Sequence, residues 1–241
     1  MPELPEVETT VRGLRPIMVG KKISEIVVRQ RNLRWIVPQN LAHILCGYEV
    51  ICVERRAKYI LIKFRHGTLL MHLGMSGRVK VVPHYVKPVK HDHIDFKLDS
   101  FLIIRYNDPR RFGCILWTSQ DIHQHHLLSN LGPEPFDQNM NGKVLHTYSR
   151  SRSTTIKQFI MNSQMIVGVG NIYANEALFR AGLRPGRAAS RVTLAEYSNL
   201  IESIRSVLRE AIRAGGTTLK DFSKVNGEPG YFVQSLNVYN R

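Results

Sequence analysis

The first residues that could carry out chemistry are Pro2 and Glu3, directly behind Met1. Removal of Met1 exposes the secondary amine of Pro2, and a free α-amine has a pKa of about 7.7 to 8.0, so an appreciable fraction is neutral and nucleophilic near pH 7. An adjacent carboxyl group can donate and remove protons while the amine attacks an anomeric carbon. The pair could carry out Schiff-base chemistry on a sugar, but acidic residues commonly begin helices to complement the helix dipole, and spacing alone favours that structural interpretation. If Met1 stays attached, the Pro2 nitrogen is a tertiary amide and cannot attack.

A further reactive candidate is Lys58, in the basic stretch ERRAKYILIKFRH at 54–66. Its apolar neighbours predict that it lies on a strand. If the ammonium is partly buried, its pKa falls and it can serve as an acid or a base. If it faces water, the stretch is a phosphate-contacting or merely solvated surface.

Two glycine-bounded tips carry side chains suited to nucleic-acid bases. Met75 stands in HLGMSG, where an exposed thioether could wedge between stacked bases. Arg110 and Phe112 stand in DPRRFG, and an arginine beside an aromatic ring suits an unstacked base. A core methionine and an ordinary turn arginine are the structural alternatives.

Other motifs chiefly exclude ligands. Gly168 and Gly170 lead into a helix whose N–H groups could hold a phosphate, but the third glycine of a dinucleotide fingerprint is missing, which argues against a nicotinamide or flavin cofactor. The histidines follow no metal-binding pattern, and Cys46, Cys52 and Cys114 lack Cys-x-x-Cys spacing. We therefore expect no metal site and no cofactor within the chain, and reduced cysteines in a core.

These residues need a scaffold, and the sequence predicts one in two parts. Residues 4–15 show helical spacing of apolar residues, and Pro16 should limit this first helix. From 23 to 117, short β-rich runs alternate with turn residues and predict a sheet or sandwich. Residues 131–142 gather Pro, Gly, Asn and Asp without periodicity, which marks a linker at a domain boundary.

Beyond the linker the periodicity is helical. The segments TIKQFIMN, NIYANEALFRAG and 193–215 predict three helices, the last with a capping box from Thr193 and Glu196. The expected fold class is α+β, with a first domain over 1–132, a linker over 133–150 and a helical domain over 151–241.

Composition narrows the class of partner. The 241 residues include 34 Lys and Arg against 19 Asp and Glu, a net charge of +15. Such a charge indicates a polyanion, with nucleic acid favoured over an anionic membrane surface. No apolar run approaches the ~18 residues that span a bilayer, and the N-terminus has no signal region. We expect a monomeric cytoplasmic protein with no membrane partner.

Taken together, the motifs resemble one family, the bacterial formamidopyrimidine-DNA glycosylases, which are base-excision repair enzymes related to endonuclease VIII. They occur in family order over nearly the whole chain: PELPEVET at 2–9, RRAKYILI at 55–62, HLGMSG at 72–77, KHDHID at 90–95, DPRRFG at 108–113, LGPEP at 131–135, VGVGNIYANEALF at 167–179 and GGTTLKDF at 215–222. Leu4 favours the purine-directed branch. The resemblance implies an N-terminal β-sandwich with a catalytic helix, joined to a helical domain with a helix-two-turns-helix motif near 165–200.

The resemblance also implies roles for particular residues. Pro2 looks like the nucleophile on C1′ of the damaged nucleoside, Glu3 like the acid that opens the deoxyribose ring, Lys58 like the general acid of a later elimination, and Glu6 like a carboxylate that positions the N-terminus.

A second set of residues matches the family's DNA contacts. Met75, Arg110 and Phe112 match the trio that fills the void left by a flipped base. His91, Arg152 and Asn171 correspond to phosphate-contacting positions, and the loop from Thr217 to Tyr231, with Lys220, to a cover over the lesion.

We therefore expect a bifunctional DNA glycosylase and abasic-site lyase that removes 8-oxoguanine and formamidopyrimidines from double-stranded DNA by a Pro2 Schiff base and β,δ-elimination. Relatives continue past SLNVYNR into a zinc finger whose four cysteines these 241 residues lack, and loss of that clamp should weaken DNA binding. A non-catalytic DNA-binding remnant is the alternative, and an RNA-binding protein is a third interpretation.

Overall fold

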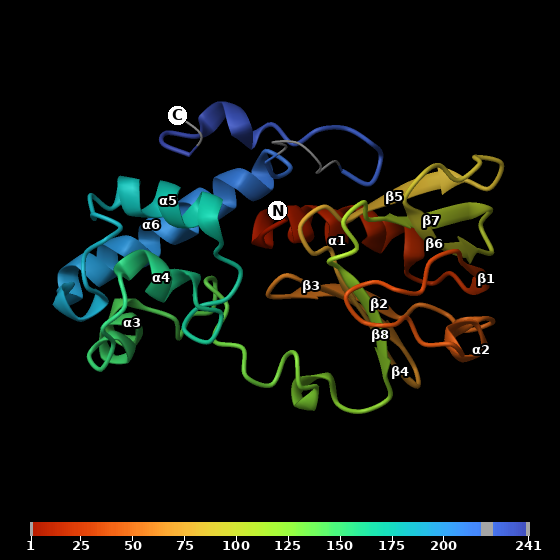
Figure 1. The fold of residues 1–241 in the computed structure, drawn as a ribbon, viewed down its shortest axis with the longest axis horizontal. Helices are drawn as coiled ribbons and strands as arrows, with labels where there is room; N and C mark the ends of the chain where they lie inside the picture. The colour runs from red at the N-terminus through yellow and green to blue at the C-terminus, as the bar shows by residue number, and fades with distance from the viewer. Residues whose placement is uncertain (1, 218–223, 240–241) are drawn as a thin grey trace.

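Residues 2–217 and 224–239, which the computed structural model describes, form two lobes joined by one long connection (Figure 1). The first lobe holds the strands and the second holds most of the helices. Helix α1 (Leu4–Met18) begins between the lobes and runs into the first one (Figure 1). The start of the chain therefore lies where the two lobes meet.

Eight strands build the first lobe as two four-stranded antiparallel sheets, with the orders β1-β6-β7-β5 and β2-β3-β4-β8. The strands are β1 (Ile23–Val28), β2 (Cys52–Arg56), β3 (Tyr59–Phe64), β4 (Gly67–His72), β5 (Arg78–Pro83), β6 (Asp92–Leu98), β7 (Leu102–Asn107) and β8 (Cys114–Thr118). Both sheets and α1 share one core, in which Val11, Ile60 and Ile94 are fully buried. The predicted sandwich is confirmed.

Helix α1 is longer than the sequence predicted. Pro16 lies inside its last turn, and the helix continues to Met18. A proline near the end of a helix removes only one backbone hydrogen bond. The N–H of Val19 still donates to the carbonyl of Arg15 over 3.1 Å, and burial of Met18 in the sandwich core favours the extra turn.

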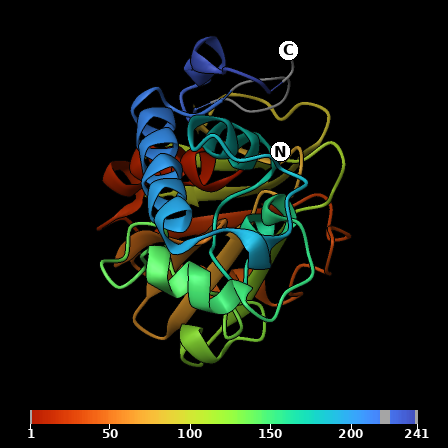
Figure 2. The same ribbon diagram turned by 90° about the vertical axis from the view of Figure 1, so that its left-hand side faces the viewer.

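The second lobe contains four helices longer than five residues within the described ranges: α3 (Gly142–Ser149), α4 (Ile156–Met161), α5 (Asn171–Arg180) and α6 (Leu194–Arg213). Both α3 and α5 pack against α6, which lies in front of α1 when the molecule is viewed from this side (Figure 2). The predicted capping box is present, because Thr193 accepts from the N–H of Glu196 and Glu196 accepts from the N–H of Thr193. Short helical segments complete the chain: α2 (Leu41–Leu45), η1 (Ile122–Gln124), η2 (Ala189–Arg191) and η3 (Phe232–Ser235).

The linker that the sequence predicted over 133–150 is partly helical. Its residues 142–149 form α3, which begins with the Asn141 side chain accepting from the N–H of Val144 and which buries Leu145 in the core of the helical lobe. The extended part before α3 is held by Arg205 of α6, which donates to the carbonyls of Pro135, Asp137 and Met140. Turn-forming composition therefore concealed a helix that its tertiary contacts stabilise.

Candidate active site

The carboxylate of Glu3 lies against the N-terminus of α5, on the other lobe. One oxygen accepts from the N–H of Gly170 over 2.6 Å, and the other accepts from the N–H of Ile172 over 3.0 Å. Both Glu3 and the neighbouring Pro2 are buried. The helix end that the sequence suggested for a phosphate is thus occupied by the protein's own anion, for the same electrostatic reason.

Close packing explains why glycines occupy positions 168 and 170, just before α5. A Cβ on Gly170 would lie 2.4 Å from the carboxyl carbon of Glu3, and one on Gly168 would lie 2.5 Å from the Leu4 side chain. Gly168 also has a φ of +83°, which a residue with a side chain rarely adopts. The two glycines therefore let the N-terminal residues approach α5.

The pKa of Glu3 is raised to about 7: burial is the main cause and the nearby Glu6 carboxylate adds to it, while the Lys58 ammonium and the two backbone N–H groups oppose the increase. A carboxyl group with this pKa is present in both its acid and its base form near neutral pH. Glu3 can therefore donate or accept a proton under the same conditions.

Glu6 connects the start of the chain to two distant segments. One of its oxygens accepts from the N–H of Glu3 over 2.7 Å. The other accepts from the Tyr173 hydroxyl and from the N–H of Thr217, the latter over 2.8 Å. The hydroxyls of Tyr173 and Thr217 are 2.9 Å apart. Burial raises the pKa of Glu6, and burial together with the Glu6 charge raises that of Tyr173 well above its usual value.

Lys58 lies in the two-residue turn between β2 and β3, whereas the sequence predicted a strand position. The turn forms because Arg56 pairs with Tyr59, so Ala57 and Lys58 alone must reverse the chain, and Ala57 takes a φ of +53°. The Lys58 ammonium lowers the pKa of both Glu3 and His72, which places it in the same site as these two groups.

The two predicted tips meet at one cavity of about 800 Å³ in the sheet lobe. Met75, Arg110 and Phe112 all line it. The Arg110 guanidinium lies 4.7 Å from the centre of the Phe112 ring. Met75 is 38% exposed and Phe112 is 45% exposed, so neither is a core residue. An apolar and cationic cavity wall of this kind fits an unstacked base.

Asp108 ties the two tips together, a role that no sequence pattern indicated. It accepts from the Ser76 hydroxyl over 2.7 Å and from the N–H of Gly113 over 2.9 Å, and Ser76 in turn accepts from the N–H of Arg110. The bonds that Asp108 makes to Ser76 and to Gly113 both lie in buried surroundings. The bonds of Asp108 and Ser76 therefore fix the position of Met75 relative to Arg110.

Two further residues near the Lys58 ammonium line the cavity without having been predicted. His72 accepts from the N–H of Gly74 through Nδ1, and burial with the nearby Lys58 and Arg34 charges lowers its pKa to about 4. Its ring is therefore neutral at pH 7 and carries its proton on Nε2. Arg34 stacks on the Trp35 ring at 4.9 Å. His72 belongs to the HLGMSG motif and could have been chosen from it, but Arg34 lies in an irregular segment with no periodic pattern.

The predicted phosphate contacts are spread over both lobes. Asn171 is the first residue of α5, exposed and next to the amides that hold Glu3. His91 precedes β6 with a φ of +70°, and Arg152 is an exposed residue between α3 and α4. The structure thus brings Asn171 to the Glu3 site, and it joins His91 to the tips, because the His91 carbonyl accepts from the N–H of Asp108 over 3.1 Å.

Of the predicted cover loop, the structure describes both ends. Thr217 is buried and bonded to Glu6, so it anchors the loop and is not part of an exposed surface. Tyr231 is 52% exposed and pairs with Thr217 in an isolated β-bridge. Lys220 lies outside the described residues.

The zinc that the family resemblance implies does not fit the residues described. Over 2–217 and 224–239, no three His, Cys, Asp or Glu side chains lie close enough together to hold a metal ion. Within the same ranges, no helix is long and apolar enough to cross a membrane.

Comparison with known proteins agrees with this geometry. The family model of the formamidopyrimidine-DNA glycosylase N-terminal domain matches residues 1–115, and that of the formamidopyrimidine-DNA glycosylase H2TH domain matches residues 131–223. The formamidopyrimidine-DNA glycosylases of Alkalilimnicola ehrlichii and Thioalkalivibrio sulfidiphilus are 53% and 54% identical to the chain, over all of it and 89% of their own length.

Solved structures show the same similarity. The MutM (Fpg) protein of Thermus thermophilus is 34% identical with a TM-score of 0.88, over 100% of this chain and 88% of that one. Wild-type Lactococcus lactis Fpg, solved with an N7-benzyl-Fapy-dG containing DNA, is 28% identical with a TM-score of 0.91, over 99% of this chain and 88% of that one. The two matched domain models and the relatives above half identity together show that the chain belongs to the formamidopyrimidine-DNA glycosylase family.

Proposed function

We propose that this protein excises oxidised purines from double-stranded DNA and then cleaves the strand, with Pro2 as the nucleophile. The observation that carries the proposal is the buried Glu3 beside Pro2, held by the N-terminus of α5 and with a pKa of about 7. A nucleophilic amine needs a partner that can both take and give a proton at neutral pH, and Glu3 has this property.

Pro2 and Glu3 together account for the bonds and protons of the first steps of the reaction. The Pro2 nitrogen forms a bond to C1′, the bond from C1′ to the base breaks, and the base leaves with the electron pair and is protonated. Glu3 gives a proton to O4′ as the ring opens, and the proton lost by the Pro2 amine restores it. The product is an iminium ion between Pro2 and the open sugar, which serves as the electron sink for the later steps.

Elimination follows from that electron sink. Loss of a proton from C2′ breaks the bond between C3′ and its phosphate oxygen, and loss of a proton from C4′ then breaks the bond between C5′ and its phosphate oxygen. Lys58, beside Glu3, is the group we assign as the acid of this stage. Water then hydrolyses the imine and restores the Pro2 amine. No redox or nucleotide cofactor enters this sequence.

We propose that the protein binds DNA because of the net positive charge of the chain and the side chains that line its cavity. The chain carries a net charge of +15, which favours a phosphate backbone. Met75, Arg110 and Phe112 line the 800 Å³ cavity and would fill the space that a flipped base leaves in the duplex. His91, Arg152 and Asn171 remain the proposed phosphate contacts. The relatives named above are bacterial, and we place the protein in the bacterial cytoplasm, where its substrate is found.

A trapping experiment tests the proposal. The 241-residue chain is incubated with a duplex containing 8-oxoguanine opposite cytosine, borohydride is added, and the adduct is located by mass spectrometry after removal of Met1 has been verified. We expect a covalent adduct on Pro2 and none in a Glu3→Gln variant given the same intact duplex.

Two results would contradict the proposal. An adduct on a lysine in place of Pro2 would reject the assigned nucleophile. Tight, salt-sensitive binding without lesion preference and without any adduct would instead support a non-catalytic DNA-binding protein, and stronger binding to structured RNA would support the third interpretation.

A further inference from the structure

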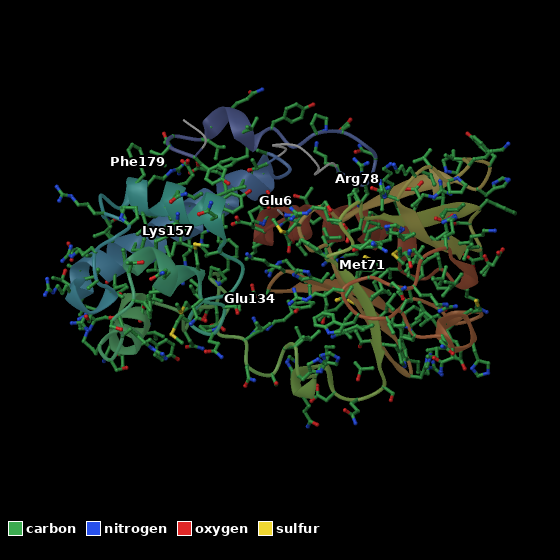
Figure 3. All side chains as sticks on the ribbon, viewed as in Figure 1. Glu6, Met71, Arg78, Glu134, Lys157 and Phe179 are labelled. Carbon is green, nitrogen blue, oxygen red and sulfur yellow. The ribbon has the colours of Figure 1, made fainter. Side chains whose placement is uncertain are left out.

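The turn that carries Lys58 is held by a carboxylate from the connection between the lobes. Glu134 Oε1 accepts from the N–H of Ala57 over 2.7 Å. The carbonyl of Ala57 is also bonded, because Arg55 Nη1 donates to it over 2.9 Å. Both backbone polar groups of the residue next to Lys58 therefore have partners outside the turn. Figure 3 shows Glu134 beside the end of the hairpin formed by β2 and β3.

Glu134 is itself fixed by the two arginines that precede the turn. Arg56 Nη1 lies 3.0 Å from its Oε1, and Arg55 Nη1 lies 2.8 Å from its Oε2. Arg56 also donates to the carbonyls of Leu131 and Gly132, over 3.1 Å and 2.7 Å. The Arg56 contact is a charge-assisted hydrogen bond, which is short and directional, whereas the Arg55 contact is an ion pair that leaves Oε2 without a hydrogen-bond donor. These contacts thus join the hairpin end to residues 131–134.

This arrangement bears directly on where the Lys58 ammonium lies. A two-residue turn has few backbone conformations, and Ala57 is kept at a φ of +53°, where residues with a side chain are uncommon. Without its external partners the turn can relax to other conformations, and a lysine side chain four carbons long would then spread its charge over a wide volume. The position of the ammonium beside Glu3 depends on the backbone of residue 57 being held.

We propose that Glu134 is a positioning residue for Lys58, which fixes the turn through Ala57 so that the Lys58 ammonium stays at the Schiff-base site. This inference rests on the proposed function, because it takes Lys58 as the acid of the elimination stage. It also assigns a task to the LGPEP motif, whose Glu134 makes the connection between the lobes part of the active site.

A double-mutant cycle tests the assignment. Glu134→Gln weakens the bond to Ala57, because a neutral amide oxygen is a poorer acceptor than a carboxylate and is no longer held in place by the charges of Arg55 and Arg56. Single-turnover strand cleavage is measured on a preformed abasic site for the parent chain, Glu134→Gln, Lys58→Ala and the double variant, together with the rate of borohydride trapping on Pro2. The matched control is Glu54→Gln, which breaks the 2.5 Å ion pair with Lys63 on the same hairpin, away from the turn.

A positioning role predicts a specific pattern. Glu134→Gln slows strand cleavage by about tenfold in the parent chain, since small misplacements of a catalytic group cost this much or more. It has less than about a twofold effect in the Lys58→Ala background, because groups that act as one unit are not additive. Trapping on Pro2 stays within about twofold of the parent, and Glu54→Gln changes neither rate.

Other outcomes separate the two proposals. If Lys58→Ala leaves strand cleavage unchanged, the proposed role of Lys58 fails. If Lys58→Ala is slow but Glu134→Gln is harmless, or is equally damaging in both backgrounds, the positioning role fails while the proposed function stands. Should Glu134→Gln unfold at the assay temperature, Arg56→Lys takes its place in the cycle, since a single ammonium does not reproduce the guanidinium fork that reaches Glu134 through Nη1 and the two carbonyls through Nη2.

Discussion

Glu3 and Gly170 are 167 residues apart in the chain and are joined by a hydrogen bond of 2.6 Å, so the second lobe holds the carboxylate of Glu3. The bond exists because Gly170 has no side chain. We therefore expect that a single methyl group added at residue 170 disturbs the site around Glu3.

Gly170→Ala should therefore lower base excision by about a hundredfold, because its Cβ would lie 2.4 Å from the Glu3 carboxyl carbon and displace it. The measurement is the single-turnover release of 8-oxoguanine. Gly186→Ala is the matched control, since a Cβ there meets nothing within 4 Å. Equal activity of the two variants would show that the contact between Glu3 and α5 is not needed for the chemistry.

The raised pKa of Glu3 predicts a pH dependence of stability. The folded protein binds this proton more tightly than the unfolded chain, so the contribution is fully present below pH 4.5 and is lost as pH rises through about 7. At about 1.4 kcal/mol for each pH unit, the loss amounts to about 3 kcal/mol. The unfolding free energy can be measured with urea at about pH 5 and about pH 8. The difference between these two free energies should be smaller in Glu3→Gln than in the parent chain. Some slope will remain, because the pKa of Glu6 is raised as well. An unchanged difference would mean that Glu3 titrates near its ordinary value of 4.5.

Tyr173→Phe tests the contact between Glu6 and the segment near Thr217. It removes the hydroxyl that donates to Glu6 and contacts Thr217, and we expect a loss of about 1–2 kcal/mol in unfolding free energy together with slower trapping on Pro2. Tyr197→Phe is the control, since it removes a buried hydroxyl that bonds the carbonyl of Ala189 far from Glu6. Both variants should lose similar stability, and only Tyr173→Phe should trap more slowly. If trapping slows equally in both, the effect is one of general stability.

Phe112→Ala should weaken lesion recognition without affecting the fold. The ring is 45% exposed, so the unfolding free energy should change by less than about 0.5 kcal/mol. Loss of a stacking surface should reduce the preference for an abasic-site duplex over an undamaged duplex by about tenfold, measured as the ratio of the two dissociation constants at one salt concentration. Phe101→Ala, on a residue that is 74% exposed and outside the cavity, should leave the ratio unchanged. A parallel weakening on both duplexes would indicate a phosphate-related effect instead.

Local signals in the sequence predicted the elements well and their long-range contacts poorly. The capping box of Thr193 and Glu196 involves residues three positions apart, so it could be recognised directly and is present. By contrast, the helix end at Gly170 has the form of a phosphate site, and only the tertiary structure shows that Glu3 occupies it. The family resemblance was confirmed because it drew on motifs along the whole chain.

The candidate site shows the same contrast between local signals, which the sequence reveals, and long-range contacts, which it does not. Met75, Arg110 and Phe112 were chosen from two separate motifs, and the structure brings them to one cavity. Asp108 and Glu134, which hold the tips and the Lys58 turn, were missed because their partners are 32 and 77 residues away. Both residues belong to recognisable motifs, but a local motif does not report such a distant partner. The roles assigned to the predicted site residues remain predictions until the variants above are measured.

The bonds that Glu6 accepts from Tyr173 and Thr217 also set the order in which the active site can form during synthesis. A ribosome adds Pro2 at the start of synthesis, but the N–H of Thr217, 211 residues after Glu6, is added near the end of these 241 residues. Contacts between such distant residues form late in folding. A nascent chain that has completed only its sheet lobe therefore lacks the contacts that hold Glu3 and Glu6, and the protein acquires its proposed DNA-cleaving activity only after both lobes have been translated and docked.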